Sequence, residues 1–163
     1  RHTPHQYPEP ANSMLLKNEN GQLVNVTQTL ANELQGLGLV TDAIWNDYDG
    51  DGDTDLTVVG EWMPITFFRN DNGVLIKSVA TGLEDATGWW FSLEKGDFDN
   101  DGDLDFIAGN LGLNYKYKTS KEKPFDVYYN DFDNNGRKDI VLGYYQDNKH
   151  FPLRGFSLSL IHI

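Results

Sequence analysis

The chain has 163 residues, of which 39% are hydrophobic and 13% aromatic, so it has enough apolar material for one domain with a core. Its formal net charge is −12, which excludes nucleic acid and anionic membrane surfaces as expected partners, because those partners need clustered Lys and Arg. The absence of cysteine excludes disulfides, thiol nucleophiles and zinc–thiolate sites. No apolar run approaches the roughly 18 residues of a membrane span, so we expect no membrane span in this segment.

Short strands and tight turns dominate the predicted elements. Asn20-Gly21 and Asn72-Gly73 each lie between apolar pairs, a pattern typical of hairpin turns that tolerate positive φ. Helical periodicity is poor except in residues 26–37, which could form a turn or two of helix. Further strands are predicted where β-branched or aromatic runs are bounded by glycine, at residues 56–59, 106–108 and 140–145.

An internal repeat organises the chain. The segments that align without a gap are "NDYDGDGDTDLTVVG" (46–60), "GDFDNDGDLDFIAG" (96–109) and "NDFDNNGRKDIVLG" (130–143). Each contains D-x-D-x-[DN]-G-x-x-D, then an apolar run and a glycine. The match extends upstream, since "KNENGQLVNV" (17–26) recurs as "RNDNGVLIKS" (69–78). One unit is therefore about 50 residues long.

A unit of this length with about four short strands is typical of a β-propeller blade. We expect an all-β chain of antiparallel blades, with approximate units at residues 13–62, 63–112 and 113–163 of a single segment, 1–163. Closed propellers need about four to eight blades. We therefore expect the remaining blades to come from the rest of a longer chain.

The acidic loops have the pattern of a calcium site. Numbered from the first Asp, positions 1, 3, 5 and 9 carry oxygen donors in every copy, and position 6 is glycine. Ca²⁺ takes about 6–8 oxygen ligands, which a short loop supplies from alternate side chains and a main-chain carbonyl. Position 7 is Arg137 in the third loop, so this position contributes its backbone oxygen or nothing.

Other interpretations of the loops are weaker. Position 12 lies in a strand and is not the bidentate Glu of an EF-hand, and Mg²⁺ prefers a less crowded, octahedral shell. Asp-Gly runs also occur as ordinary turn chemistry, but three copies with the same donors favour metal binding. The third loop has fewer ligand carboxylates, because Asn135 replaces an Asp, and we expect it to bind Ca²⁺ most weakly.

At these residues the sequence resembles the FG-GAP/VCBS repeat family of integrin-α-type propellers. More narrowly, it is similar to the cartilage acidic protein type of repeat in bacterial secreted propellers. The likeness covers most of residues 13–151. It implies a calcium-stabilised propeller at the cell surface or outside the cell, secreted or associated with a bacterial outer membrane, that binds a protein or glycan ligand in adhesion.

The resemblance also implies up to three bound Ca²⁺ ions, one for each loop. The residues that would hold them are Asp47, Asp49, Asp51, Asp53 and Asp55; Asp97, Asp99, Asp101, Asp103 and Asp105; and Asp131, Asp133, Asn135, Arg137 and Asp139.

No catalytic constellation stands out, because the metal loops contain 13 of the 25 acidic residues and no histidine lies in a recognisable pattern. We expect a non-catalytic module; the alternative is part of an extracellular carbohydrate-active enzyme, a polysaccharide lyase or hydrolase, or a lectin. Trp89 and Trp90 could form a sugar-stacking platform, although burial of at least one of them is the more common outcome. Trp62 and Met63 are placed on a loop, where we expect them to pack between blades. The C-terminal "FSLSLIHI" matches no part of the repeat.

Overall fold

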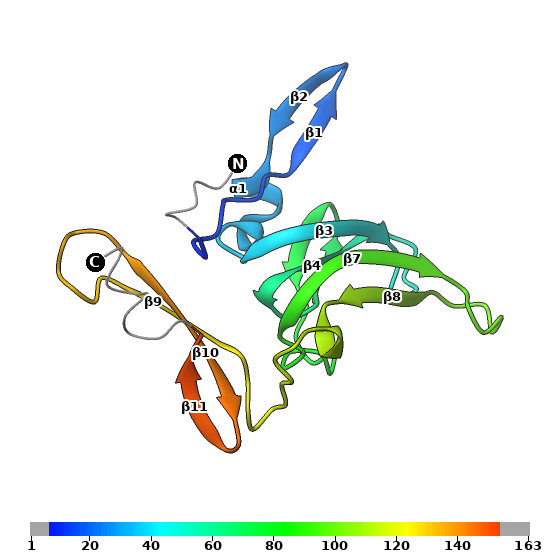
Figure 1. Cartoon of the computed structure of the whole chain (residues 1–163). Coiled ribbons are helices and arrows are strands. Elements are labelled where there is room, and N and C mark those ends of the chain that lie inside the picture. Colours follow the sequence, from blue (N-terminus) through cyan, green and yellow to red (C-terminus); the bar gives the residue numbers. More distant parts are fainter. Residues whose placement is uncertain (1–6, 154–163) are drawn as a thin grey trace. The chain divides into compact units, whose positions relative to one another are not determined.

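The computed structural model of the chain describes residues 7–153 (Figure 1), so the C-terminal "FSLSLIHI" lies outside the described residues. The chain divides into two compact units, one formed by Pro10–Leu111 and the other by Arg1–Glu9 with Gly112–Ile163. In the described part of the chain, no helix has the length and apolar character needed to cross a membrane.

Most of the secondary structure belongs to the unit Pro10–Leu111. Its elements are β1 (Leu16–Glu19), β2 (Gln22–Asn25), α1 (Thr27–Leu30), the 3₁₀ turn η1 (Asn32–Leu34), β3 (Leu39–Asn46), β4 (Asp55–Met63), β5 (Thr66–Asp71), β6 (Val74–Lys77), β7 (Gly88–Gly96) and β8 (Asp105–Asn110). The other unit contains the 3₁₀ turn η2 (Gly112–Asn114), β9 (Asp126–Asn130), β10 (Asp139–Gln146) and β11 (Lys149–Pro152).

All the strand pairs are antiparallel, and the strands form three separate sheets. Strands β3, β4, β5 and β6 pair in chain order as a four-stranded meander, and β7–β8 joins it where Glu61 and Met63 of β4 pair with β7. The hairpin β1–β2 and the sheet β9–β10–β11 are separate. This confirms the all-β prediction and is consistent with propeller-blade segments, although among residues 7–153 the hydrogen-bonded sheets do not close into a ring.

Two hairpin turns have the backbone conformation that the sequence predicts. In the β1–β2 turn, Asn20 and Gly21 have φ of 54° and 89°, and in the β5–β6 turn, Asn72 and Gly73 have φ of 53° and 91°. Positive φ at both central residues defines the turn that matches the right-handed twist of a hairpin. The β10–β11 turn at Asp147-Asn148, with φ of 49° and 63°, has the same form without a glycine.

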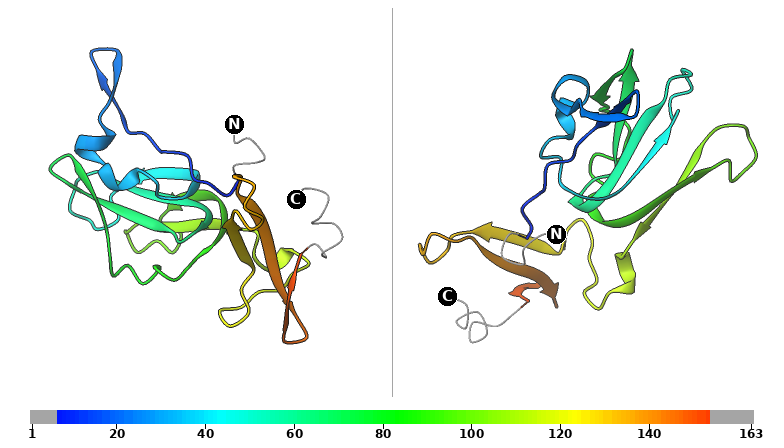
Figure 2. Two further views of the ribbon diagram at one scale, coloured as in Figure 1. Left: turned by 90° about the vertical axis from the view of Figure 1, so that its left-hand side faces the viewer. Right: turned by 90° about the horizontal axis from the view of Figure 1, so that it is seen from above.

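A small core lies on one face of the meander. Leu56 and Val58 of β4, Phe68 of β5 and Leu75 of β6 are each at most 6% exposed and cluster with residues of the α1–η1 segment. The predicted turn or two of helix is therefore confirmed, and its role is to cover this face with Ala31 and Leu34. The hairpin β1–β2 projects from the sheet next to α1, as Figure 1 and the left view of Figure 2 show.

The loop placement of Trp62 and Met63 is wrong. Both residues are the last two of β4, and the Met63 side chain is 3% exposed in the core cluster. Trp62 has φ of 61° and its ring meets that of Trp89 edge-on at 5.0 Å between centroids. Pairing with β7 accounts for the difference, because Glu61 and Met63 both pair with this strand across a register shift at Trp62. Trp89 and Trp90 lie in β7 and are partly buried.

Candidate metal sites in three equivalent loops

Each acidic loop connects two neighbouring antiparallel strands. The loops lie between β3 and β4, between β7 and β8, and between β9 and β10. The residue before position 1 pairs with position 9 in every copy, in the pairs Asn46↔Asp55, Gly96↔Asp105 and Asn130↔Asp139. The sheet register therefore closes all three loops at the same point.

The same two hydrogen bonds shape every loop. In the first loop, the backbone N–H of Gly52 donates to Asp47 Oδ2 at 3.1 Å, and the N–H of Tyr48 donates to Asp55 Oδ2 at 3.2 Å. The equivalent bonds are Gly102 to Asp97 and Phe98 to Asp105 in the second loop, and Gly136 to Asp131 and Phe132 to Asp139 in the third. The carboxylates at positions 1 and 9 therefore organise the backbone as well as facing the loop interior.

Left-handed backbone conformations at positions 4 and 6 curl the loop around its carboxylates. Position 6 is always glycine, with φ of 93°, 99° and 83° in the three copies. Position 4 is Gly50, Asn100 or Asn134, with φ of 73°, 63° and 58°. Glycine and asparagine are the residues that adopt this region at least cost. The restriction of position 4 to Gly or Asn was a sequence signal of the loop geometry that the repeat pattern left unspecified.

Three carboxylates come together in each loop. In each trio, one oxygen per residue lies within 4.8 Å of the others, and the trios are Asp47, Asp49 and Asp55; Asp97, Asp99 and Asp101; and Asp131, Asp133 and Asp139. Oxygens this close can share one cation with coordination distances of about 2.3–2.6 Å. The other predicted ligands, Asp51, Asp53, Asp103, Asp105, Asn135 and Arg137, lie in the same loops but are not members of these trios.

At position 7 the backbone N–H donates to the side chain at position 5, and the predicted role of its carbonyl oxygen stays a prediction. The N–H of Arg137 donates to Asn135 Oδ1 at 2.8 Å, and the N–H groups of Asp53 and Asp103 donate in the same way to Asp51 and Asp101. In the third loop the amide of Asn135 also donates to Asp133 Oδ2 at 2.8 Å. One oxygen of that trio is thus already engaged by a side-chain donor.

Part of the negative charge of the first loop is buried away from solvent. Asp47 Oδ1 is buried and has no hydrogen-bond partner among residues 7–153. Asp55 is 0% exposed, and burial raises its pKa, with the negative charge of Asp49 adding to the effect and the Asn70 N–H opposing it. Ionised carboxylates in such surroundings cost free energy unless a positive charge compensates them. The donor set and the unpartnered oxygen both fit a hard cation.

The second loop shows the same crowding at positions 5 and 7. A hydrogen bond from the Asp103 backbone lowers the pKa of Asp101. The side-chain hydrogen bond with Asp101, followed by the negative charge of the same residue, raises the pKa of Asp103. Two neighbouring carboxyl groups whose pKa values move in opposite directions interact closely, as expected where carboxylates are concentrated.

The comparison with protein families agrees with this geometry. The model of the FG-GAP-like repeat matches residues 47–108, from position 1 of the first loop to the apolar run that follows the second loop. This segment is an FG-GAP-like repeat. The match confirms the resemblance to the FG-GAP/VCBS family seen in the sequence. Neither a curated protein nor a solved structure shows significant similarity to the chain.

The FG-GAP-like segment contains two of the three loops and the strands β4, β5, β6 and β7 between them. The segment therefore belongs to a β-propeller-like repeat module, in which each loop connects two strands of a blade-like sheet. The third loop lies beyond the matched residues, but it has the hydrogen bonds and the left-handed positions of the other two. Its carboxylate trio is at positions 1, 3 and 9, as in the first loop, whereas the trio of the second loop is at positions 1, 3 and 5.

Proposed function

We propose that the chain is a calcium-binding β-propeller repeat module that acts outside the cell and presents its loops to a protein or glycan partner. The observation that carries the calcium proposal is the equivalence of the three loops. Each loop encloses a carboxylate trio with the same backbone scaffold, and in the first loop a buried oxygen of Asp47 has no donor.

Within each loop, positions 1, 3, 5 and 9 would supply side-chain oxygens to the ion, and position 7 would supply its carbonyl oxygen. In the first loop these side chains are Asp47, Asp49, Asp51 and Asp55. The bound ion supplies positive charge that offsets the repulsion among them. The proposed role is structural, because the ligands hold the turn between two strands.

An extracellular setting suits sites of this kind. Calcium sites in extracellular modules have modest affinity, with Kd of about 10⁻⁴–10⁻³ M, which external calcium is sufficient to occupy. The chain has no cysteine, so bound ions would provide the cross-links that disulfides provide in many secreted domains. The exposed residues at positions 3 to 7 would lie on the partner-facing surface, ordered by the ion beneath them.

Calorimetric titration of calcium into chelator-treated protein tests the proposal. We expect up to three bound ions per chain, and we expect the combined variant Asp47→Asn, Asp97→Asn and Asp131→Asn to lose them. Magnesium at the same concentration should compete weakly. Absence of calcium binding by the folded wild-type chain would overturn the proposal.

Binding assays with and without a calcium chelator test the partner class. We expect retention of a protein or glycan ligand in calcium and its loss on chelation, without chemical change of the ligand. Cleavage of a polysaccharide on the same array would instead support the alternative, an extracellular carbohydrate-active enzyme.

A further inference from the structure

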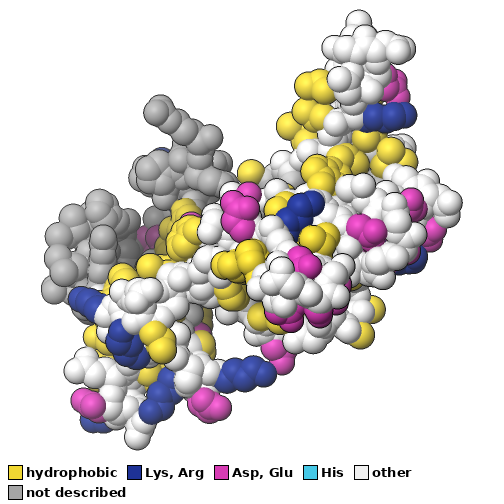
Figure 3. Space-filling model, turned by 90° about the vertical axis from the view of Figure 1, so that its right-hand side faces the viewer, with side chains coloured by type: hydrophobic (Ala, Val, Ile, Leu, Met, Phe, Trp, Pro, Cys, Tyr) yellow, Lys and Arg dark blue, Asp and Glu magenta, His cyan; other side chains and the backbone are white. Residues whose placement is uncertain are grey.

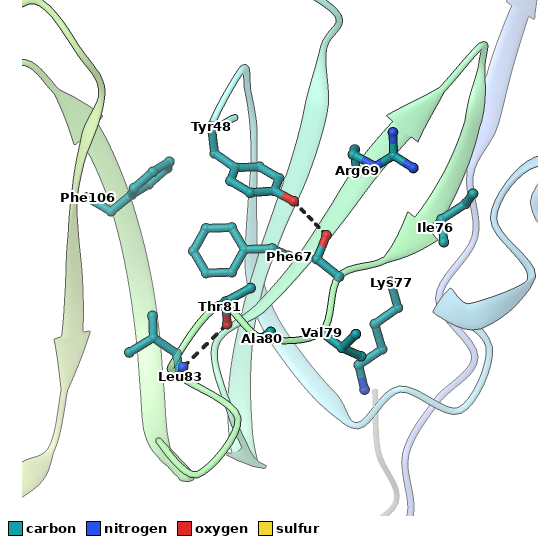
Figure 4. A pocket seen from close by; sticks show the side chains of 11 residues that line it. Tyr48, Phe67, Arg69, Ile76, Lys77, Val79, Ala80, Thr81, Leu83 and Phe106 are labelled. Atoms are coloured by element: carbon teal, nitrogen blue, oxygen red, sulfur yellow. Dashed lines mark hydrogen bonds between the residues drawn. The ribbon is translucent and has the colours of Figure 1, made fainter. Parts of the chain in front are cut away.

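A pocket of about 570 Å³ lies beside β8 in the unit Pro10–Leu111. In Figure 4, Phe106 projects from β8 on one side, and Tyr48 and Phe67 lie on the other. The rings of Phe67 and Phe106 meet edge-on at 5.8 Å, and Leu83 and Val79 of the segment after β6 complete the apolar wall. The pocket is therefore an open recess with an apolar wall, to which the first acidic loop contributes Tyr48.

The repeat explains why this recess exists. Phe106 is the equivalent of Leu56, and Phe67 is the equivalent of Leu15, in the alignment of the repeated segments. In the first copy, Leu56 and Leu15 belong to the core that Phe68 of β5 and Leu75 of β6 fill, with exposures of 0% and 5%. No hairpin equivalent to β5–β6 pairs with β8, whose pairing partner among the described residues is β7. The pocket is the space that such a hairpin fills in the first copy.

The hairpin β1–β2 exposes apolar side chains that its repeat-equivalent buries. Its Leu16 and Leu23 are the equivalents of Phe68 and Leu75, yet they are 46% and 67% exposed. Figure 3 shows hydrophobic side chains exposed along this projecting hairpin at the top of the view. The same unit thus has two exposed apolar side chains on β1–β2 and an apolar recess beside β8 that no hairpin of the described residues fills.

The two hairpins are built alike. Leu16 pairs with Asn25 and Asn18 with Leu23, and the equivalent pairs of β5–β6 are Phe68 with Lys77 and Asn70 with Leu75. Both turns are fastened by the same hydrogen bond. The N–H of Gly21 donates to Asn18 Oδ1 at 2.8 Å, and the N–H of Gly73 donates to Asn70 Oδ1 at 2.7 Å. The hairpin β1–β2 therefore has the shape that the recess accepts.

Asp105, at the start of β8, is the equivalent of the hydrogen-bond acceptor that holds the β5–β6 hairpin in the first copy. In the first copy, the N–H of Asn70 donates to Asp55 Oδ1 at 2.7 Å, and Leu56 pairs with Phe68. The equivalent Asp105 accepts the Phe98 N–H through Oδ2. Asn18 would take the place of Asn70 on Asp105 Oδ1, and Leu16 would pair with Phe106.

We propose that the β1–β2 hairpin of one copy of this chain adds to the β8 edge of a second copy and places Leu16 and Leu23 in its pocket. Strand addition at an open edge combines main-chain hydrogen bonds with side chains in a recess. Within one copy, two hydrogen bonds hold the hairpin at α1: the Val26 N–H donates to the Leu15 carbonyl oxygen, and the Leu15 N–H donates to the Thr27 hydroxyl. Strand β8 lies at the far end of the order of the main sheet. The contact is head-to-tail, so it propagates from copy to copy.

Light scattering on the purified chain over a range of protein concentration tests this proposal, with calcium held constant. We expect the mass to rise with concentration for the wild type. It should stay at the monomer value for the hairpin variant Leu16→Lys with Leu23→Lys, and for the pocket variant Leu83→Arg. The matched control Val24→Lys alters the other face of the same hairpin and should associate like the wild type.

Mixing the two defective variants separates docking from misfolding. The hairpin variant retains an intact pocket and the pocket variant retains an intact hairpin, so an equimolar mixture should form a heterodimer that grows no further. A wild type that is monomeric at every concentration would overturn the proposal. So would a mixture that stays monomeric, or oligomers that Leu83→Arg leaves unchanged. These outcomes do not depend on whether the loops bind calcium.

Discussion

The carboxylate of Asp55 shows how one side chain can serve both the fold and a proposed ion. Its two oxygens accept backbone hydrogen bonds from Tyr48 and Asn70, and the residue is fully buried. Replacing Asp55 would therefore disturb the sheet whether or not an ion binds. Asp49 is exposed and accepts a hydrogen bond from the nearby Asp51 N–H, so its replacement disturbs the sheet less and reports on ion binding more directly.

Asp49→Ala should weaken calcium binding to the first loop by about tenfold or more, because affinity in such loops follows the number of charged ligands. Asp53→Ala, at position 7 of the same loop, should change it little, because the backbone of this residue serves the site. Calorimetric titration of both variants checks the difference. Equal losses for Asp49→Ala and Asp53→Ala would show that position 7 binds through its carboxylate.

The third loop should be the weakest site, and Asn135→Asp should strengthen it. The substitution adds a carboxylate and removes the amide that donates to Asp133. We would measure it in a chain whose other loops carry Asp49→Ala and Asp99→Ala, so that the third loop dominates the titration. An unchanged affinity, or a third loop that binds most tightly in the wild type, would contradict this prediction.

At the scale of elements, equivalent hairpins have different surroundings. The hairpins β1–β2 and β5–β6 share register and turn, but every residue of β1–β2 is exposed, whereas β5–β6 buries Phe68 and Leu75. What differs is the sheet beside each hairpin: β5 pairs with β4, and β1–β2 forms a sheet of its own. The stability contributed by a hairpin therefore comes from its neighbours.

Phe68→Ala should lower the free energy of unfolding by about 3–5 kcal/mol, because it leaves a cavity in the core. The repeat-equivalent Leu16→Ala should change it by less than about 0.5 kcal/mol in dilute solution, because its side chain is exposed. Denaturant unfolding followed by tryptophan fluorescence compares the two variants. A comparable loss for Leu16→Ala in the monomer would mean that β1–β2 packs on a core of its own.

At the scale of the whole molecule, charge decides how the chain responds to ions. The formal net charge is −12, and three divalent ions would offset half of it. Of the 25 acidic residues, 13 lie in three turns between strands, so binding would act on the fold at three points.

Removing calcium should lower the melting temperature. A ligand at about 100 times its Kd stabilises the folded state by about 2.7 kcal/mol for each site, and each kcal/mol corresponds to about 2–4 °C for a chain of this size. Thermal unfolding in excess calcium and in excess chelator, at matched ionic strength, measures the effect. Identical melting temperatures would refute calcium stabilisation.

The sequence by itself determined the repeat, the oxygen donors at fixed loop positions, the strands after each loop and the two Asn-Gly turns. These features follow from local backbone preferences and from the spacing of residue types, which act over a few residues. Only the tertiary structure decided that Met63 is in the core, that Leu16 and Leu23 are exposed while Phe68 and Leu75 are buried, and that a recess lies beside β8. Burial depends on which strands come together, and two hairpins with the same local pattern cannot reveal that difference.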